Sequence, residues 1–167
     1  MNAPEILTNR LRLRAYKQSD FKHYSGLMTS DRARYVDGPV TLGTAWNLFA
    51  AGAGRWALVG YGAWAIERRS DSASIGVIGL NHPIEPHHER ELGWLLWSGF
   101  EGHGYATEAA QAARSFAFAS LGWSELVSYI DKDNHPSIRL AERLGGQYDN
   151  EASLMMDDRT LVYRYSA

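Results

Sequence analysis

The sequence of 167 residues contains no cysteine. This absence excludes disulfide bonds, thiolate metal ligands and a cysteine nucleophile. The net charge is also small, because 17 Lys and Arg residues nearly balance 19 Asp and Glu residues and leave −2. A chain without a global positive field does not attract nucleic acid or an anionic membrane. We therefore expect neither partner, and any anionic ligand must be held by local groups.

Long hydrophobic runs are absent as well. The most apolar stretch, residues 45–66, is interrupted by Asn47, Arg55 and four glycines, so it does not predict a membrane-spanning helix. Residues 1–14 carry charges throughout and lack the apolar core of a signal peptide. We expect a cytoplasmic protein.

The composition is that of a packed globular protein, with 45% hydrophobic residues and six tryptophans. The length suits one compact domain, whereas two domains would each have a small core. Neither a linker nor an internal repeat divides the chain. We therefore expect a single domain over residues 1–167.

Hydrophobic spacing predicts a mixture of strands and helices. Leu11, Leu13 and Ala15 alternate with three arginines, which predicts a strand whose arginines face water. The strongest helix signal covers residues 104–121 and ends at Gly122. Three successive strands followed by a strand–helix–strand unit indicate an α+β protein with a mixed sheet. Further strands are predicted at 61–68, 74–80, 91–97, 125–130 and 160–165, and further helices at 18–28, 41–53 and 134–144.

The segment 91–108 carries the clearest functional pattern. A predicted strand is followed by a loop with Gly99, Gly102 and Gly104 and then by the strongest helix. Glycines allow backbone N–H groups to approach a ligand closely, and the helix N-terminus adds unpaired donors and a positive dipole end. This arrangement predicts a site for a pyrophosphate. The alternative is that the glycines only form a tight strand-to-helix turn.

Two other phosphate-binding folds fit the segment less well. A dinucleotide-binding oxidoreductase domain would need a third glycine where Thr107 stands, and repeated βαβ units. The three successive strands speak against it, although it stays an alternative. A P-loop would need a Gly-Lys-Ser/Thr ending, which this loop lacks.

The residues Gly-His-Gly-Tyr-Ala-Thr-Glu-Ala at 102–109 resemble the cofactor motif of the GNAT N-acetyltransferases, especially the Rim-type branch that acetylates ribosomal-protein N-termini. Residues 9–14, 91–96 and 133–145 resemble further segments of that branch, so the resemblance covers most of the chain. It implies an α+β GNAT-like fold, with a mixed sheet of about six to seven strands flanked by about four helices.

The resemblance also implies a donor site for acetyl-CoA, without a metal. Its pantetheine arm would pair with the strand at Leu95, Leu96 and Trp97, with Asn134 and Ser137 beside it. One departure is Gly99, where the family usually has Gln or Arg, and another is Gly146, where an aromatic residue is common. The amides expected to hold the pyrophosphate are those of Gly102, His103, Gly104, Tyr105, Ala106 and Thr107.

Without a cysteine, the simplest reaction is direct attack of a neutral amine on the thioester. The resemblance places Ser137 beside the sulfur, where it would protonate the leaving thiolate, although a serine there could instead satisfy first-turn backbone groups of its helix. Glu91 is the candidate base, acting through water, although a glutamate at a strand end is usually solvated. Trp94 and Trp97 lie three positions apart and should point to opposite faces.

The remaining expectations concern partners. The run His87-His88-Glu89 lacks metal-ligand spacing and is interpreted as a feature of the surface or the substrate rim. The favoured acceptor is a protein N-terminal amine, with a small-molecule amine as the other candidate, and a homodimer would be compatible with the fold. The alternative to catalysis is an acyl-CoA binding or sensing module.

Overall fold

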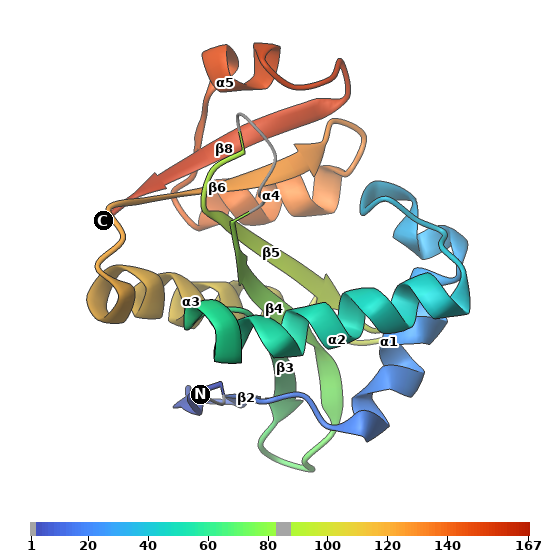
Figure 1. Ribbon diagram of the computed structural model, residues 1–167. Coiled ribbons are helices and arrows are strands. Elements are labelled where there is room, and N and C mark those ends of the chain that lie inside the picture. Colours follow the sequence, from blue (N-terminus) through green and yellow to red (C-terminus); the bar gives the residue numbers. More distant parts are fainter. Residues whose placement is uncertain (1–2, 83–87) are drawn as a thin grey trace.

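The computed structural model describes residues 3–82 and 88–167. Within these residues, eight strands form one sheet in the order β1-β2-β3-β4-β5-β6-β8-β7 (Figure 1). Neighbouring strands are antiparallel except for β5 and β6, which are parallel. The strands are β1 (Ile6–Leu7), β2 (Leu11–Arg14), β3 (Ala63–Arg68), β4 (Ser74–Asn81), β5 (Glu91–Leu96), β6 (Glu125–Asp131), β7 (Gln147–Tyr148) and β8 (Thr160–Ser166).

Helices cover both faces of this sheet. α1 and α2 lie on one face, whereas α3 and α4 lie on the other (Figure 1). α3 connects the parallel strands β5 and β6, as expected for a crossover between parallel neighbours. The α-helices are α1 (Phe21–Met28), α2 (Leu42–Val59), α3 (Tyr105–Leu121), α4 (His135–Arg143) and α5 (Asn150–Leu154), and the 3-10 helices are η1 (Gln18–Asp20) and η2 (Asp31–Tyr35).

The predicted α+β class and mixed sheet are confirmed, but the sheet is slightly larger than predicted. The described residues hold eight strands and five α-helices, against the expected six to seven strands and four helices. The additional elements are short: β1 and β7 have two residues each and α5 has five. Segments of that length carry no readable hydrophobic period.

The main core lies between the sheet and α3. Small side chains on α3 let the helix approach the sheet closely, and Ala109 and Ala113 are fully buried there. Leu11 and Leu13 are fully buried on β2, as their alternation predicts. Burying a leucine side chain contributes roughly 1.5–3 kcal/mol. A second cluster under α1 and α2 contains Trp97.

α2 extends farther than predicted, to Val59 instead of residue 53. Its first turn is capped by Thr41, whose side chain accepts the Thr44 N–H at 3.1 Å. The buried Trp56 anchors its last turns, because the indole N–H donates to the Ala63 carbonyl at 2.9 Å. This tertiary contact overrides the weak helical preference of the glycines around residue 53. No helix in the described part of the chain combines the length and apolar character needed to cross a membrane.

The alternation of arginines in β2 predicts that Arg14 faces water, and this prediction is wrong. Its side chain is buried and bonds Asp20 at 2.8 and 3.0 Å and Glu67 at 2.5 Å. The two carboxylates compensate the buried guanidinium, which is why the position tolerates burial. Although burial opposes it, hydrogen bonds from Arg14 and from the Lys17 N–H lower the pKa of Asp20.

Candidate active site

A cleft opens where the two parallel strands β5 and β6 separate. Across the described residues, their register joins them at Glu91 and Val127 alone. Beyond this point the Ser128 hydroxyl stands between the strands and donates to the Leu92 carbonyl at 2.6 Å. Tyr165 donates to the same hydroxyl at 3.2 Å and holds it in place. Beyond Glu91 and Val127, the two strands are therefore linked through a side chain instead of by continued backbone pairing.

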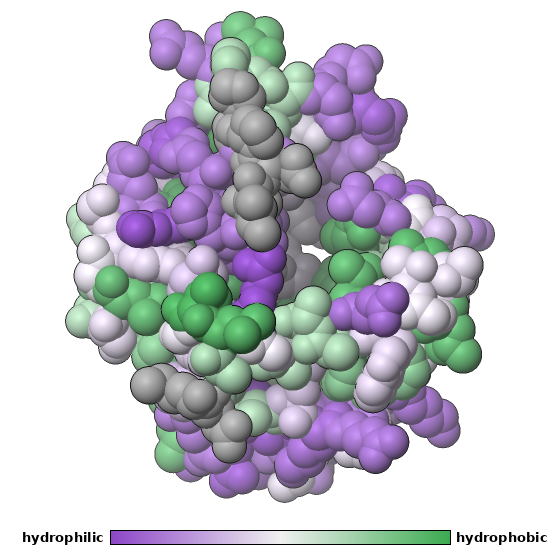
Figure 2. Space-filling view, viewed as in Figure 1, coloured by the Kyte–Doolittle hydropathy of each residue, from purple (hydrophilic) through white to green (hydrophobic). Residues whose placement is uncertain are grey.

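The cleft has a volume of about 810 Å³. The surface is visibly hollowed near the centre of the face shown in Figure 2. Its walls come from β5, β6, η2, α4 and the glycine loop with the first turn of α3. A volume of this size accommodates an extended organic ligand.

One backbone edge of β5 faces this cleft. The Trp97 N–H donates to Ile75 at 2.9 Å on the β4 side, and a Cβ on Gly76 of β4 would overlap the Leu95 carbonyl. Alternate residues of a strand point their N–H and C=O groups to opposite edges. Trp94 and Leu96 therefore direct their backbone groups toward the cleft. Of the strand residues predicted to pair with pantetheine, only Leu96 has this orientation.

The glycine loop lies at one end of the open edge. Gly99, Gly102 and Gly104 have φ values of 88°, 79° and 78°, which strongly favour glycine. Gly104 is also the N-cap of α3, and its helix N-terminus has no side-chain cap. The first amides of α3 are therefore available to an anion.

The β1–β2 connection supports this loop from behind. Arg10 donates to the His103 carbonyl at 2.9 Å and to the Glu108 carboxylate at 2.7 Å. The Thr8 hydroxyl donates to the same carboxylate at 2.6 Å. Despite its partial burial, these bonds lower the pKa of Glu108. A charged carboxylate in the first turn also suits the α3 dipole.

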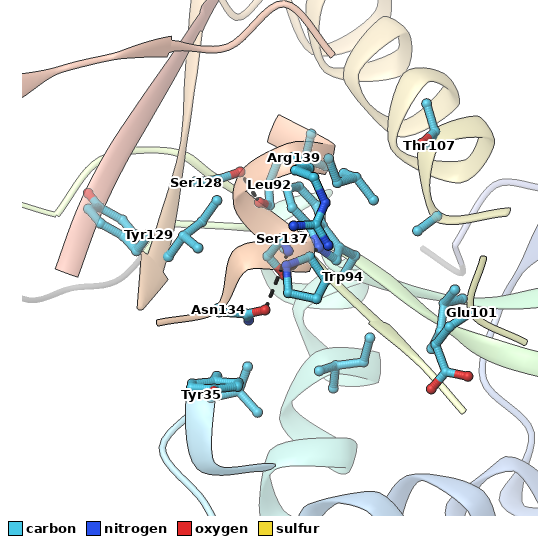
Figure 3. A pocket seen from close by; sticks show the side chains of 18 of the residues that line it. Tyr35, Leu92, Trp94, Glu101, Thr107, Ser128, Tyr129, Asn134, Ser137 and Arg139 are labelled. Atoms are coloured by element: carbon cyan, nitrogen blue, oxygen red, sulfur yellow. Dashed lines mark hydrogen bonds between the residues drawn. The ribbon is translucent and has the colours of Figure 1, made fainter. Parts of the chain in front are cut away.

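Ser137 lies on α4 and faces Trp94 of β5 (Figure 3). The Trp94 indole N–H donates to Ser137 Oγ at 3.2 Å. The Asn134 side chain accepts the Ser137 N–H at 3.4 Å and so caps the helix. The hydroxyl of Ser137 is therefore not the cap. Because an indole can only donate, the hydroxyl proton of Ser137 stays available to another group.

Glu91 begins β5 and lines the same cleft. Its side chain is half-buried and accepts a hydrogen bond from the Asn81 amide at 3.3 Å. Burial raises the pKa of Glu91, while the Asn81 hydrogen bond partly opposes this shift. A carboxylate with a raised pKa takes up a proton more readily than an exposed one.

The chain just before Glu91 is tied to the C-terminal half of the sheet. Arg164 of β8 binds the Glu89 carboxylate with two bonds of 2.7 and 2.8 Å and also bonds Asp149 at 2.9 Å. The Glu89 N–H donates to the Tyr129 hydroxyl at 2.7 Å. Glu89 therefore acts as an anchor for the segment that leads into β5. Within the described residues no group of three metal-ligating side chains converges, and His87 lies outside them.

The residues nominated from the sequence are partly brought together. Trp97 is buried in the second core and lies away from the cleft, opposite in orientation to Trp94, as their odd spacing predicts. His103 and Tyr105 belong to the loop and helix but do not line the cleft. The nominated residues that do line it are Glu91, Leu95, Leu96, Gly102, Gly104, Ala106, Thr107, Asn134 and Ser137.

Several lining residues were not found from the sequence. Ser128, which bonds the Leu92 carbonyl across the two strands, is one of them. For Trp94 the sequence predicted the opposite orientation to Trp97 but not the bond to Ser137. Four arginines also reach the cleft, two from η2 and two from α4, and they give it cationic walls in a chain of net negative charge. They are Arg32, Arg34, Arg139 and Arg143.

Residues 10–147 match the family model of the acetyltransferase (GNAT) domain. The chain therefore belongs to the GNAT acetyltransferase family and is an acyltransferase by family. An acetyltransferase from Agrobacterium tumefaciens strain C58, known from its crystal structure, is 42% identical, with a TM-score of 0.91. The match covers 100% of this chain and 96% of that one. The GNAT resemblance of the sequence is thereby confirmed.

Two further proteins are similar over different shares of the chain. The uncharacterized N-acetyltransferase YoaA of Bacillus subtilis (strain 168) is 32% identical over 84 residues, which make up 50% of this chain and 48% of YoaA. The alignment thus spans about half the length of that relative. The ribosomal L7/L12 α-N-protein acetyltransferase RimL, solved with coenzyme A, has a TM-score of 0.73 at 20% identity over 98% of both chains. This likeness concerns the fold alone.

Proposed function

We propose that this protein transfers the acetyl group of acetyl-CoA directly to a primary amine, with a protein N-terminal amine as the favoured acceptor. The observation that carries the proposal is the open edge of β5. Backbone groups of Trp94 and Leu96 that β6 does not pair with face a cleft that has a glycine loop at one end and Glu91 at the other, and Arg32 donates to the Leu96 carbonyl. Such an edge suits an extended chain with amides, and the loop suits a pyrophosphate.

The proposed reaction needs few side chains. Glu91 accepts a proton from the ammonium group of the acceptor through water, and its raised pKa suits this role. The neutral amine attacks the thioester carbonyl, a C–N bond forms, and the C–S bond breaks. A backbone N–H on the open edge of β5 stabilises the oxyanion.

The departing thiolate takes a proton from Ser137, and the attacking nitrogen returns a proton to the Ser137 oxygen as the amide forms, so that the products are an amide and a free thiol. The Trp94 indole supports this role, because it occupies a lone pair of Ser137 Oγ and leaves the hydroxyl proton free. Asn134 caps α4, so Ser137 is not needed as a cap. Proton transfer to the leaving group by a positioned side chain contributes typically ~10²–10⁴-fold to such reactions.

The preference for an N-terminal amine rests on the resemblance of residues 9–14, 102–109 and 133–145 to the Rim-type branch. The geometry of the cleft is also compatible with a small-molecule amine. Both candidate acceptors react through a primary amine, so the reaction is the same for each. They differ only in the rest of the molecule that carries the amine.

Calorimetric titration with acetyl-CoA, followed by a free-thiol assay against N-terminal peptides, free amino acids and polyamines, tests the proposal. We expect micromolar binding and thiol release that depends on the acceptor and is fastest with peptides. Release with small amines alone would replace the favoured acceptor. Binding without release from any amine would indicate a sensing module, and absence of binding would refute the proposal.

A further inference from the structure

Arg32 connects the N-terminal wall of the cleft to the glycine loop. It lies on η2 and forms an ion pair with Glu101 in the loop between β5 and α3. The same guanidinium donates to the Leu96 carbonyl at 3.3 Å, on the open edge of β5. Arg32 therefore stands at the junction of the strand edge and the loop.

Glu101 places a negative charge in a loop suited to an anion. One of its carboxylate oxygens accepts the Gly99 N–H at 2.8 Å, and the other faces Arg32. The carboxylate is thus hydrogen-bonded to the Gly99 amide. Its negative charge would repel a pyrophosphate bound to the same loop. The nearby glycines contribute no side chain to offset that repulsion.

The pair formed by Arg32 and Glu101 is exposed. The side chains are 41% and 50% accessible to solvent. Ion pairs of this kind contribute little to stability, so separating the partners is easy. A guanidinium binds a phosphate with two charge-assisted hydrogen bonds, which is a stronger interaction than an exposed pair with a carboxylate.

We propose that Arg32 exchanges Glu101 for the pyrophosphate of the coenzyme when the donor binds. Glu101 acts as an internal anion that keeps Arg32 at the glycine loop while the cleft is free. Arg32 supplies a cation beside the glycine loop, and it does so from a segment about seventy residues earlier in the chain. This inference rests on the proposed function, because it requires the donor to be a coenzyme A thioester.

Binding of free coenzyme A to purified variants tests the exchange without requiring turnover. Arg32→Gln should weaken binding about tenfold, the loss of a charge-assisted hydrogen bond. Glu101→Gln should tighten binding by about threefold, because Arg32 then has no competing partner. Lys22→Gln is the matched control, since it removes one exposed positive charge from the neighbouring α1 and should leave binding unchanged.

The double variant separates exchange from simple neutralisation. If Arg32 binds pyrophosphate, Arg32→Gln combined with Glu101→Gln should still bind about tenfold more weakly than Glu101→Gln alone. Equal binding by these two variants would overturn the exchange, because Arg32 would then act only by cancelling Glu101. Weaker binding of coenzyme A by Glu101→Gln than by the natural protein would also overturn the proposal. It would indicate that the ion pair between Arg32 and Glu101 only stabilises the shape of the loop.

A shortened donor provides the second readout. S-acetylpantetheine carries the thioester and the amides but lacks the pyrophosphate. Arg32→Gln should lower kcat/KM about tenfold with acetyl-CoA and leave it unchanged with S-acetylpantetheine. Equal losses with both donors would show that Arg32 only supports η2 and would refute the proposal. Coenzyme A binding that responds as expected, in a protein that transfers no acetyl group, would refute the proposed function alone.

Discussion

The Trp94 indole N–H donates to the Ser137 hydroxyl oxygen at 3.2 Å and so joins β5 to α4 across the cleft. The strand that offers its backbone edge to a ligand therefore also orients the candidate proton donor. Trp94 contributes in two ways, through its backbone at the open edge and through its side chain. This geometry makes separate predictions for the two residues.

Ser137→Ala should lower kcat by about 10²-fold and change the KM for acetyl-CoA little, because the thiolate then leaves without a positioned proton. Trp94→Phe should lower kcat by less, about 2- to 10-fold, since the hydroxyl remains but loses its orienting bond. Thiol release under saturating acetyl-CoA measures both. Ser137→Thr retains the hydroxyl and should recover most of the rate. An alanine variant with the natural rate would contradict the role of Ser137.

Glu91→Gln should lower kcat by about 10²–10⁴-fold and remove the acidic limb of the pH–rate profile. In the natural protein that limb should fall as the pH decreases through the raised pKa of Glu91. A raised carboxyl pKa means that the folded state binds the proton more tightly than the unfolded state, so stability falls as the pH rises toward that pKa. Glu91→Gln should therefore raise Tm at pH 7. A variant with an unchanged acidic limb would show that another group is the base.

Arg14→Gln should destabilise the protein by about 3–5 kcal/mol, because it leaves Asp20 buried without a guanidinium and leaves Glu67 with only the longer ion pairs to Arg12 and Lys17, at 3.4 and 3.8 Å. Urea unfolding measures the loss. Arg12→Gln is the matched control on the same strand. Its side chain also pairs with Glu67, but at a longer 3.4 Å and with 43% exposure, so the expected effect is below about 1 kcal/mol. Similar losses of unfolding free energy in both variants would show that the burial of Arg14 does not determine its contribution to stability.

The same ionic network predicts a pH dependence of stability. The pKa of Asp20 is lowered in the folded state, so its contribution is fully present above the unfolded pKa of about 3.9. That contribution is lost as the pH falls through the folded pKa. Asp20→Asn should therefore flatten the acid limb of the unfolding free energy, measured by urea titrations between pH 2 and 6, a window of about two pH units on either side of that value. An unchanged acid limb would place the titrating group elsewhere.

The parts of the fold that the sequence predicted correctly depend on local pattern. The period of Leu11 and Leu13 and the alanine stripe of α3 are visible within one element. The burial of Arg14 could not be predicted in this way, because its partner Glu67 lies 53 positions away. β1 and β7 were missed because two residues carry no period.

The site was predictable to the same extent. The glycine loop and the α3 N-terminus form one continuous segment, so their succession could be predicted from residues 99–107. Trp94 and Ser137 are 43 positions apart, and Arg32 and Glu101 are 69 positions apart. Contacts over such separations depend on the packing of the sheet with α4 and η2, which no local pattern contains.

Gly104→Ala should weaken coenzyme A binding by about tenfold, because the φ of 78° places a Cβ in the left-handed region at a strain of roughly 1–2 kcal/mol. Relief of that strain would rotate the first amides of α3 away from the cleft. Space is not the limit, since the new Cβ would lie 3.5 Å from Arg10 Nη2. Gly26→Ala in α1 is the control, with open space around its Cβ, and should stabilise the protein by about 0.5–1 kcal/mol without altering binding. Calorimetry with coenzyme A and urea unfolding of both variants separate the effects. If Gly104→Ala loses stability but binds coenzyme A as tightly as the natural protein, the α3 amides do not hold the pyrophosphate.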